Sequence, residues 1–375
     1  MRPIIDGHLD LAWNGVSFDR DLTLSLQELR AAEQRMTDEP GRGHATVTLP
    51  ELRQGRIYVA VVTLLARSGP AHARQVKYGR TDLDYSTRAG SYCAAHAQLA
   101  WYELMQQRGE VLILRTRGEL QQHWQACLRA TERQPLGVIL SMEGTDPIVF
   151  PQQLHDYWQK GLRAAGPAHY GFSHYAAGTT VDGPLTEDGR QLLREMSSLG
   201  MILDVTHLSD TSMEEAFELF DGPMIASHHN CRALVPGDRQ LTDDQIRTLL
   251  ARDAVIGAAL DAWMLYPNWQ RGVTRPTVVG IEAVADHLDH VCQLAGDCRH
   301  SAIGSDLDGG FGFEQTPRDL QSIVELHRLE EILASRGYGS DDLDAIFYGN
   351  WLRKLSEALP DSVPGIEPDS VPGIE

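Results

Sequence analysis

The sequence predicts an α/β protein, a (β/α)8 TIM barrel with a binuclear metal centre at its C-terminal mouth. Two observations lead to this prediction. Eight short apolar or β-branched runs alternate with longer amphipathic stretches, and six of those runs have a histidine, aspartate or glutamate at or next to their last residue. Such alternation is typical of parallel βαβ units. Eight units within 375 residues fit a closed barrel better than an open doubly wound sheet.

The expected elements follow one another regularly along the chain. The runs expected as strands are 3–9, 57–66, 136–143, 161–169, 201–207, 223–228, 254–260 and 301–306. Helical periodicity predicts helices at 85–108, 117–133, 187–199, 209–219, 241–252, 279–295, 318–335 and 340–358. Ser209 and Thr242 stand where capping residues begin a helix. We expect residues 19–53 to form an insertion between the first two strands, where it could cover a site at the mouth of the barrel.

No change of composition, Pro/Ser-rich linker or run of charge divides residues 1–358. We therefore expect one barrel domain rather than two α/β halves. Residues 359–375 contain the octapeptide PDSVPGIE twice, at 360–367 and 368–375. Because its prolines are incompatible with a helix or a central strand, we expect a disordered tail there.

Charge and cysteine content exclude several classes of protein. The 33 Lys and Arg against 52 Asp and Glu leave a net charge of −19, which disfavours nucleic acids and anionic membranes as partners. The five cysteines form no CxxC pair, so we expect reduced thiols and a cytoplasmic protein. Asp6 and Asp10 interrupt the apolar stretch that a secretory signal needs. No window offers the ~18 uncharged apolar residues of a membrane span.

The ends of the predicted strands carry metal-binding residue types. In a TIM barrel the catalytic groups lie at the C-terminal ends of the strands. The first strand ends in His8-Leu9-Asp10, and alternate side chains of an extended chain point to the same side. The third, fourth, fifth, sixth and eighth runs end in Glu143, His169, His207, His228 and Asp306. Each residue alone has an ordinary structural explanation, but a set of imidazoles and carboxylates without a thiolate favours a two-metal hydrolase.

Eight motifs occur in order along the chain: DGHLDLAWN at 6–14, SMEGTDPI at 141–148, GLRAAGPAHYG at 161–171, LTEDGRQLLREMSSLGMILDVTHLSD at 185–210, PMIASHHNCRAL at 223–234, DRQLTDDQI at 238–246, AIGSDLDGG at 302–310 and GNWLRKL at 349–355. In this order and spacing they resemble the membrane dipeptidase (renal dipeptidase) family of amidohydrolase-like, metal-dependent barrels. The resemblance covers essentially all of residues 1–358. It implies the same barrel fold.

The resemblance also implies a ligand set. His8 and Asp10 would hold one divalent metal ion, His207 and His228 would hold the other, and Glu143 would bridge both. Imidazole and carboxylate ligands favour Zn²⁺ for the two ions.

Further residues match substrate-binding and catalytic positions of the family. His169 would contact the region of the scissile carbonyl, and Arg239 would bind the C-terminal carboxylate of the substrate as a planar bidentate donor. Asp306 would take a proton from the bridging water. Asp308, two residues further along, is the rival for that role.

The resulting prediction is a metallo-dipeptidase that hydrolyses small dipeptides through a metal-bridging hydroxide. The preferred dipeptide stays open, including a D-configured C-terminal residue, because residues 19–53 and 67–86 have no counterpart in the family. Leu-Ala-Trp-Asn also replaces the family's Pro-containing turn after Asp10. The alternatives are another binuclear amidohydrolase that acts on a cyclic amide, lactone or ester, and a non-catalytic barrel that serves as a binding protein. The family resemblance allows a homodimer, for which the sequence shows no apolar surface stripe.

Overall fold

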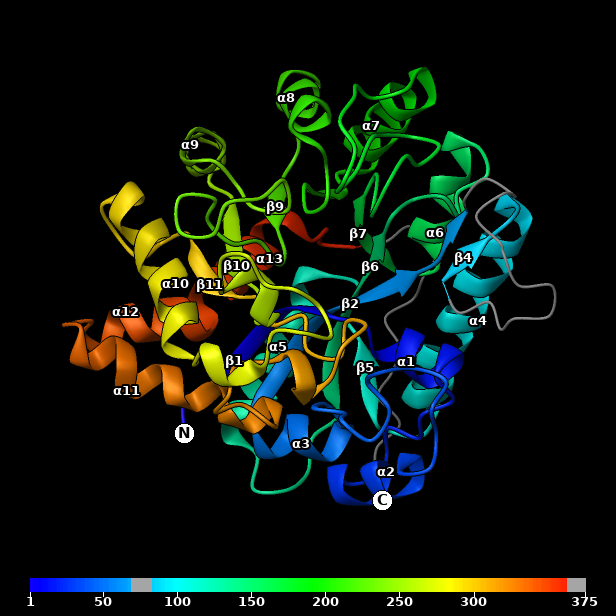
Figure 1. Cartoon of the computed structure of the whole chain (residues 1–375). Helices are drawn as coiled ribbons and strands as arrows, with labels where there is room; N and C mark the ends of the chain where they lie inside the picture. The colour runs from blue at the N-terminus through cyan, green and yellow to red at the C-terminus, as the bar shows by residue number, and fades with distance from the viewer. Residues whose placement is uncertain (69–82, 363–375) are drawn as a thin grey trace.

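The computed structural model describes residues 1–68 and 83–362 and confirms the predicted barrel (Figure 1). Eight parallel strands follow the order β1-β2-β6-β7-β8-β9-β10-β11. Each lies within a predicted run. Their bounds are β1 Ile4–Leu9, β2 Ile57–Leu65, β6 Leu136–Glu143, β7 Leu162–Gly166, β8 Ile202–Asp204, β9 Met224–Ala226, β10 Val255–Ala258 and β11 Ser301–Ile303.

A side chain joins the first strand to the last. Oδ1 of Asp6, in β1, accepts hydrogen bonds from the backbone N–H of Ser305 at 2.8 Å and of His8 at 3.1 Å. The N–H of Asp306 donates to the carbonyl of His8 at 3.3 Å. Between β8 and β9, Oδ1 of Asp204 likewise accepts from the N–H groups of Thr206 and Ser227, each at 3.1 Å. These carboxylates replace ladder bonds, which explains why β8, β9 and β11 end earlier than predicted.

Most of the predicted helices are present and surround the strands (Figure 1). They are α4 Arg88–Gln107, α5 Arg117–Arg129, α7 Glu187–Leu199, α8 Asp210–Leu219, α9 Asp243–Ala251 and α10 Glu282–Ala295. The side chains of Ser209 and Thr242 cap α8 and α9 as predicted. No helix of the described residues combines the length and the apolar character needed to span a bilayer.

The last two predicted helices are partly wrong. Residues 318–335 become helical only from a short 3₁₀ turn at 323–327 and α11 Arg328–Ser335, because the N–H of Arg318 donates to Val279 and that of Ile323 donates to Thr46. Residues 340–358 divide into α12 Ser340–Asp344, a π-helical turn at 345–349 and α13 Asn350–Ala358. The short elements that the periodicity did not reveal are α1 Leu11–Ser17, α2 Leu26–Glu33, α3 Leu49–Gln54, α6 Leu154–Gln159, β3 Arg67–Ser68, β4 Asp84–Tyr85 and β5 Val111–Ile113.

The inside of the barrel is an apolar core sealed by α13. Buried side chains from all eight strands form one cluster with Trp351, Leu355 and Leu359. The indole Nε1 of Trp351 donates to the carbonyl of Ile303 at 2.8 Å. Its ring lies so close to Gly7 that a Cβ there would meet it at 2.4 Å, so this position of β1 requires glycine. Leu359 belongs to this core, one residue beyond the predicted domain end at 358. Residues 363–375, most of the tandem repeat, lie outside the described range.

The insertion at 19–53 is fastened to the loop that follows β11. The carboxylate of Asp308 accepts hydrogen bonds from Thr46 N at 2.8 Å, from Thr46 Oγ1 at 2.6 Å and from Val47 N at 3.1 Å. Arg20 lies 3.7 Å from the same carboxylate. The insertion therefore packs against the loop that carries Asp306.

Candidate metal centre

The ligand-type residues meet at the C-terminal ends of the strands. His8 lies within β1, Asp10 is the first residue after that strand, and Glu143 is the last residue of β6. The other groups stand two or three residues beyond their strands rather than at the ends, and these are His169, His207, His228 and Asp306. His207 and Asp306 have φ angles of 70° and 57°. Left-handed backbone is uncommon for residues other than glycine and is concentrated at functional sites.

The carboxylate of Glu143 lies at the centre of the cluster. Its Oε1 is 3.0 Å from Nε2 of His207 and 3.3 Å from Nε2 of His228. Its Oε2 is 3.7 Å from Nε2 of His8. The two oxygens therefore face different histidines, as a bridging carboxylate requires.

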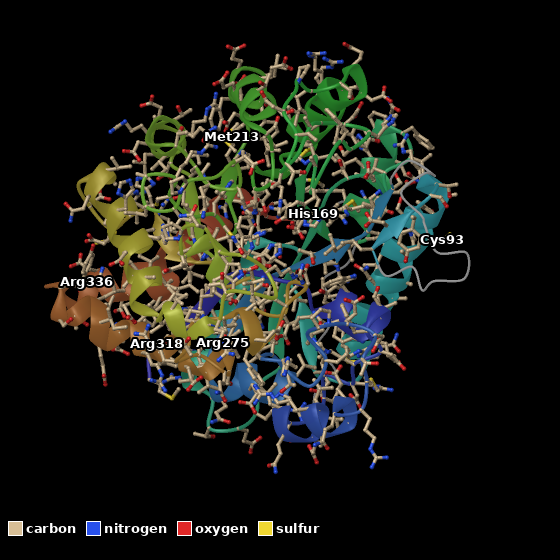
Figure 2. The ribbon with its side chains drawn as sticks, viewed as in Figure 1. Cys93, His169, Met213, Arg275, Arg318 and Arg336 are labelled. Carbon is tan, nitrogen blue, oxygen red and sulfur yellow. The ribbon has the colours of Figure 1, made fainter. Side chains whose placement is uncertain are left out.

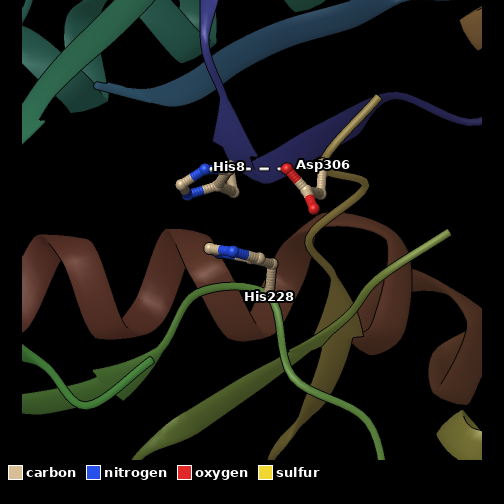
Figure 3. A group of neighbouring side chains, drawn as sticks. All are labelled: His8, His228 and Asp306. Carbon is tan, nitrogen blue, oxygen red and sulfur yellow. Dashed lines mark ion pairs between the residues drawn. The ribbon is translucent and has the colours of Figure 1, made fainter. Parts of the chain in front are cut away.

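A second group of side chains surrounds His8. Its Nε2 lies 3.8 Å from Oδ1 of Asp10 and 3.9 Å from Oδ1 of Asp306. Figure 3 shows His8 and Asp306 joined across this distance, with His228 beside them. Within the part of the chain that the structure describes, ligand atoms within 4.8 Å of one another form three sets: His8 with Asp10 and Glu143, Glu143 with His207 and His228, and His8 with His228 and Asp306. The first two sets correspond to the two sites that the family resemblance implies. The third brings Asp306 within reach of an ion as well.

Hydroxyl groups turn the histidines toward Glu143. Oγ1 of Thr179 lies 2.9 Å from Nδ1 of His207, and Oγ of Ser227 lies 2.9 Å from Nδ1 of His228. The hydroxyl of Thr63 donates to Oδ1 of Asp10. Such outer partners orient metal-binding side chains. The sequence prediction missed all three hydroxyls, and only Ser227, next to His228, had a neighbouring signal.

The buried carboxylates of the cluster would be stabilised by bound cations. Burial raises the pKa of Glu143 to about 8 and that of Asp306 well above its usual range. Burial opposes protonation of His8, but Glu143, Asp10 and Asp306 raise its pKa to about 10. Burial lowers the pKa of His207 and His228 well below its usual range, which favours the neutral imidazole that binds metal ions.

Two atoms at the centre test whether the site fits metal ions. Among the described residues, neither Nε2 of His8 nor Oε1 of Glu143 forms a hydrogen bond, although Nε2 of His207 lies 3.0 Å from that oxygen. Unpaired buried polar atoms are costly and rare. Carboxylate oxygens and imidazole nitrogens are ligands of Zn²⁺ and related ions. The donor set therefore fits divalent cations.

The predicted substrate-binding residues lie beside the cluster. Nε2 of His169 is 3.9 Å from Oε1 of Glu143, and its ring lies 4.3 Å from that of His207. Figure 2 labels His169 near the middle of the molecule. Arg239 is buried, with 1% of its surface exposed, and its Nη2 donates to the carbonyl of His228 at 3.0 Å. Its Nη1 has no partner among the described residues and so can receive a ligand.

Asp306 and Asp308 differ sharply in their surroundings. Asp306 faces His8, whereas the carboxylate of Asp308 is saturated by hydrogen bonds from Thr46 and Val47. Asp306 therefore lies at the cluster, whereas Asp308 anchors the insertion at 19–53.

Comparisons with known proteins agree with this architecture. A family model described as "Membrane dipeptidase (Peptidase family M19)" matches residues 1–360. An uncharacterised protein from the pqqA 5′ region of Klebsiella pneumoniae is 27% identical over 236 residues, 60% of this chain and 84% of that protein. The dipeptidase aclJ of Aspergillus oryzae is 30% identical over 221 residues, 56% of this chain and 50% of its own length. The match spans about half the length of such curated dipeptidases.

Solved structures show the same fold. A metallopeptidase from Rhodobacter sphaeroides, liganded with a phosphinate mimic of the dipeptide L-Ala-D-Ala, superposes with a TM-score of 0.75 at 22% identity. The metallopeptidase dipeptidase AC superposes with a TM-score of 0.74 at 23% identity. Each alignment covers 96% of this chain and 99% of the other.

The position of Glu143 between His8 on one side and His207 and His228 on the other generates the first prediction. Glu143→Ala should remove both metal ions, because one carboxylate faces both sets of histidines, whereas His207→Ala should empty mainly one site. Elemental analysis of the purified, reconstituted variants measures occupancy, with Glu218→Ala, an exposed position on α8, as the control. Full occupancy in Glu143→Ala would show that Glu143 is not the bridge.

Proposed function

Since this chain belongs to the membrane dipeptidase family, peptidase family M19, we propose that it hydrolyses the peptide bond of small dipeptides with the help of two divalent metal ions, Zn²⁺ being favoured. The observation that carries the proposal is the position of Glu143, whose two carboxylate oxygens face His207 and His228 on one side and His8 on the other. A cytoplasmic location and a homodimer remain predictions.

The metal-binding residues would prepare the reaction. His8, Asp10, His207 and His228 would hold the ions on either side of Glu143. When bound, two such ions lower the pKa of a shared water and polarise the carbonyl under attack.

The neighbouring side chains would guide the substrate and its protons. The carboxylate of Asp306 would accept the proton that the attacking water loses and return it to the nitrogen of the leaving amine. Nε2 of His169 would donate a hydrogen bond to the carbonyl oxygen as negative charge develops there. The free Nη1 of Arg239 would bind the C-terminal carboxylate, which limits the length of chain beyond the scissile bond.

A substrate panel tests the proposal. The panel contains dipeptides with L- and D-configured C-terminal residues, their C-terminal amides, and cyclic amides, lactones and esters, each assayed with added Zn²⁺. The D-configured members are included because the Rhodobacter relative binds a mimic of such a dipeptide. We expect turnover of free-acid dipeptides and loss of that turnover on chelation. Turnover of only cyclic substrates or esters would identify a different binuclear hydrolase.

Asp306 and Asp308 supply a matched pair of variants. Asp306→Asn should retain the metals, change KM by a small factor and lower kcat by ~10² or more, the usual scale for loss of a general acid or base. Asp308→Asn should instead lower the melting temperature, because the insertion loses its anchor. Steady-state kinetics and thermal unfolding of both variants measure these effects. A kcat defect in Asp308→Asn beside a near wild-type Asp306→Asn would exchange the two roles.

Arg239 should determine the preference for a free carboxylate. A charge-assisted hydrogen bond is worth ~1.5–3 kcal/mol, so amidation of the C-terminus should lower kcat/KM by about 10- to 150-fold, each 1.4 kcal/mol being tenfold. Arg239→Met should impose a similar loss on the free acid and abolish most of the difference between acid and amide. If the variant discriminates as strongly as the wild type, Arg239 is not the anchor.

A further inference from the structure

Arg67, which lies outside the predicted site, contacts the ring nitrogen of His169 that does not face Glu143. Arg67 follows β2 directly, in the two-residue strand β3, and its Nη1 lies 3.2 Å from Nδ1 of His169. Only 18% of its side chain is exposed. No motif of the sequence singled out this residue.

The guanidinium is itself held in place. Nη2 of Arg67 donates to Oδ2 of Asp84 at 2.8 Å. Asp84 belongs to β4, and its Cα pairs with that of Arg67 in the ladder between β3 and β4. The ion pair and the ladder together fix the direction from which Arg67 approaches the imidazole.

The chemistry of the contact assigns the proton of His169. A guanidinium carries only hydrogen-bond donors, so Nδ1 of His169 must be the acceptor. A neutral imidazole that accepts at Nδ1 carries its proton on Nε2. Nε2 is the nitrogen that faces the cluster, 3.9 Å from Oε1 of Glu143. The contact with Arg67 therefore leaves a donor pointed at the reaction centre.

The position of the His169 backbone and ring is set independently of this contact. Its carbonyl accepts from the N–H of Thr179 at 3.0 Å, and its ring packs edge-on against those of Tyr170 and His207, with centroids at 4.9 and 4.3 Å. None of these contacts distinguishes one tautomer of the imidazole from the other. The contact with Arg67 does distinguish them.

We propose that Arg67 is a positioning residue of the dipeptidase reaction, which holds His169 in the tautomer whose Nε2–H donates to the carbonyl oxygen of the substrate. The inference rests on the proposed function for its consequence in catalysis. The assignment of the tautomer rests only on the contact between Arg67 and His169. The two parts can therefore fail separately.

Kinetics on the metal-loaded protein test the catalytic part. Removing one donor to a developing oxyanion lowers kcat by about 10²–10³. In Arg67→Met a fraction of the molecules still carries the proton on Nε2 of His169, so the loss should be smaller. We expect kcat to fall about 10- to 100-fold and KM to stay within a factor of about three. Arg67→Lys should recover much of this loss, since an ammonium also donates to Nδ1. Arg247→Met, at an exposed position on α9, is the control and should match the wild type.

A double-mutant cycle separates positioning from general damage. In a His169→Ala background, Arg67→Met should cost less than a factor of about two, because the group through which it acts is gone. Metal content should stay at the wild-type level in every variant of Arg67. An equal loss of kcat in both backgrounds, or no loss in either, would overturn the proposal.

A spectroscopic measurement tests the tautomer without any substrate. In protein labelled with ¹⁵N-histidine, the resonances lost in His169→Gln identify His169. We expect an unprotonated Nδ1 and a protonated Nε2 in the wild type, and a shift toward the other tautomer in Arg67→Met. If the wild type turned over no dipeptide but Arg67→Met showed this shift, the proposed function would fail and the tautomer assignment would stand. An unchanged tautomer in Arg67→Met would overturn the role of Arg67.

Discussion

The burial of negative charge at one end of the barrel is the constraint on which the rest of the site depends. Asp10, Glu143 and Asp306 all lie around Nε2 of His8, and Glu143 is buried without a hydrogen-bonding partner for Oε1 among the described residues. Taking an isolated carboxylate out of water costs several kcal/mol, and the cost is avoided by protonation or by a cation. Two divalent cations bound by these groups would offset this cost.

The surrounding structure keeps these charges together. The carboxylates of Asp6 and Asp204 join neighbouring strands where the ladder ends, and so fix the backbone on either side of the site. The insertion at 19–53 is tied through Asp308 to the loop that carries Asp306. Left-handed backbone at His207 and Asp306 is tolerated because these attachments hold it. The barrel thus supplies stiffness, while the loops beyond its strands supply the chemistry.

The sequence predicted the barrel well because each strand is a short apolar run. It also predicted which polar residues meet at the mouth, because those runs end in residues that resemble a known pattern, and the role of these residues as metal ligands stays a prediction. It could not place the partners that act across long distances. Asp308 contacts Thr46, 262 positions away, and Arg67 contacts His169, 102 positions away. Periodicity in the sequence predicts neither contact, because it reports only on neighbouring residues. The short elements β3, β4 and β5 were not predicted, because two or three residues are too few to show a period. The predicted helix at 318–335 failed at its start because tertiary hydrogen bonds engage its first residues.

We propose that Glu143 lies between two metal ions at the mouth of the barrel. A crystal structure of the Zn²⁺-loaded protein, with anomalous difference maps calculated from data on both sides of the zinc absorption edge, tests it most directly. We expect two anomalous peaks at bonding distance from the Glu143 carboxylate, one near His8 and Asp10 and the other near His207 and His228. The absence of any peak, or a single peak that does not contact Glu143, would contradict it.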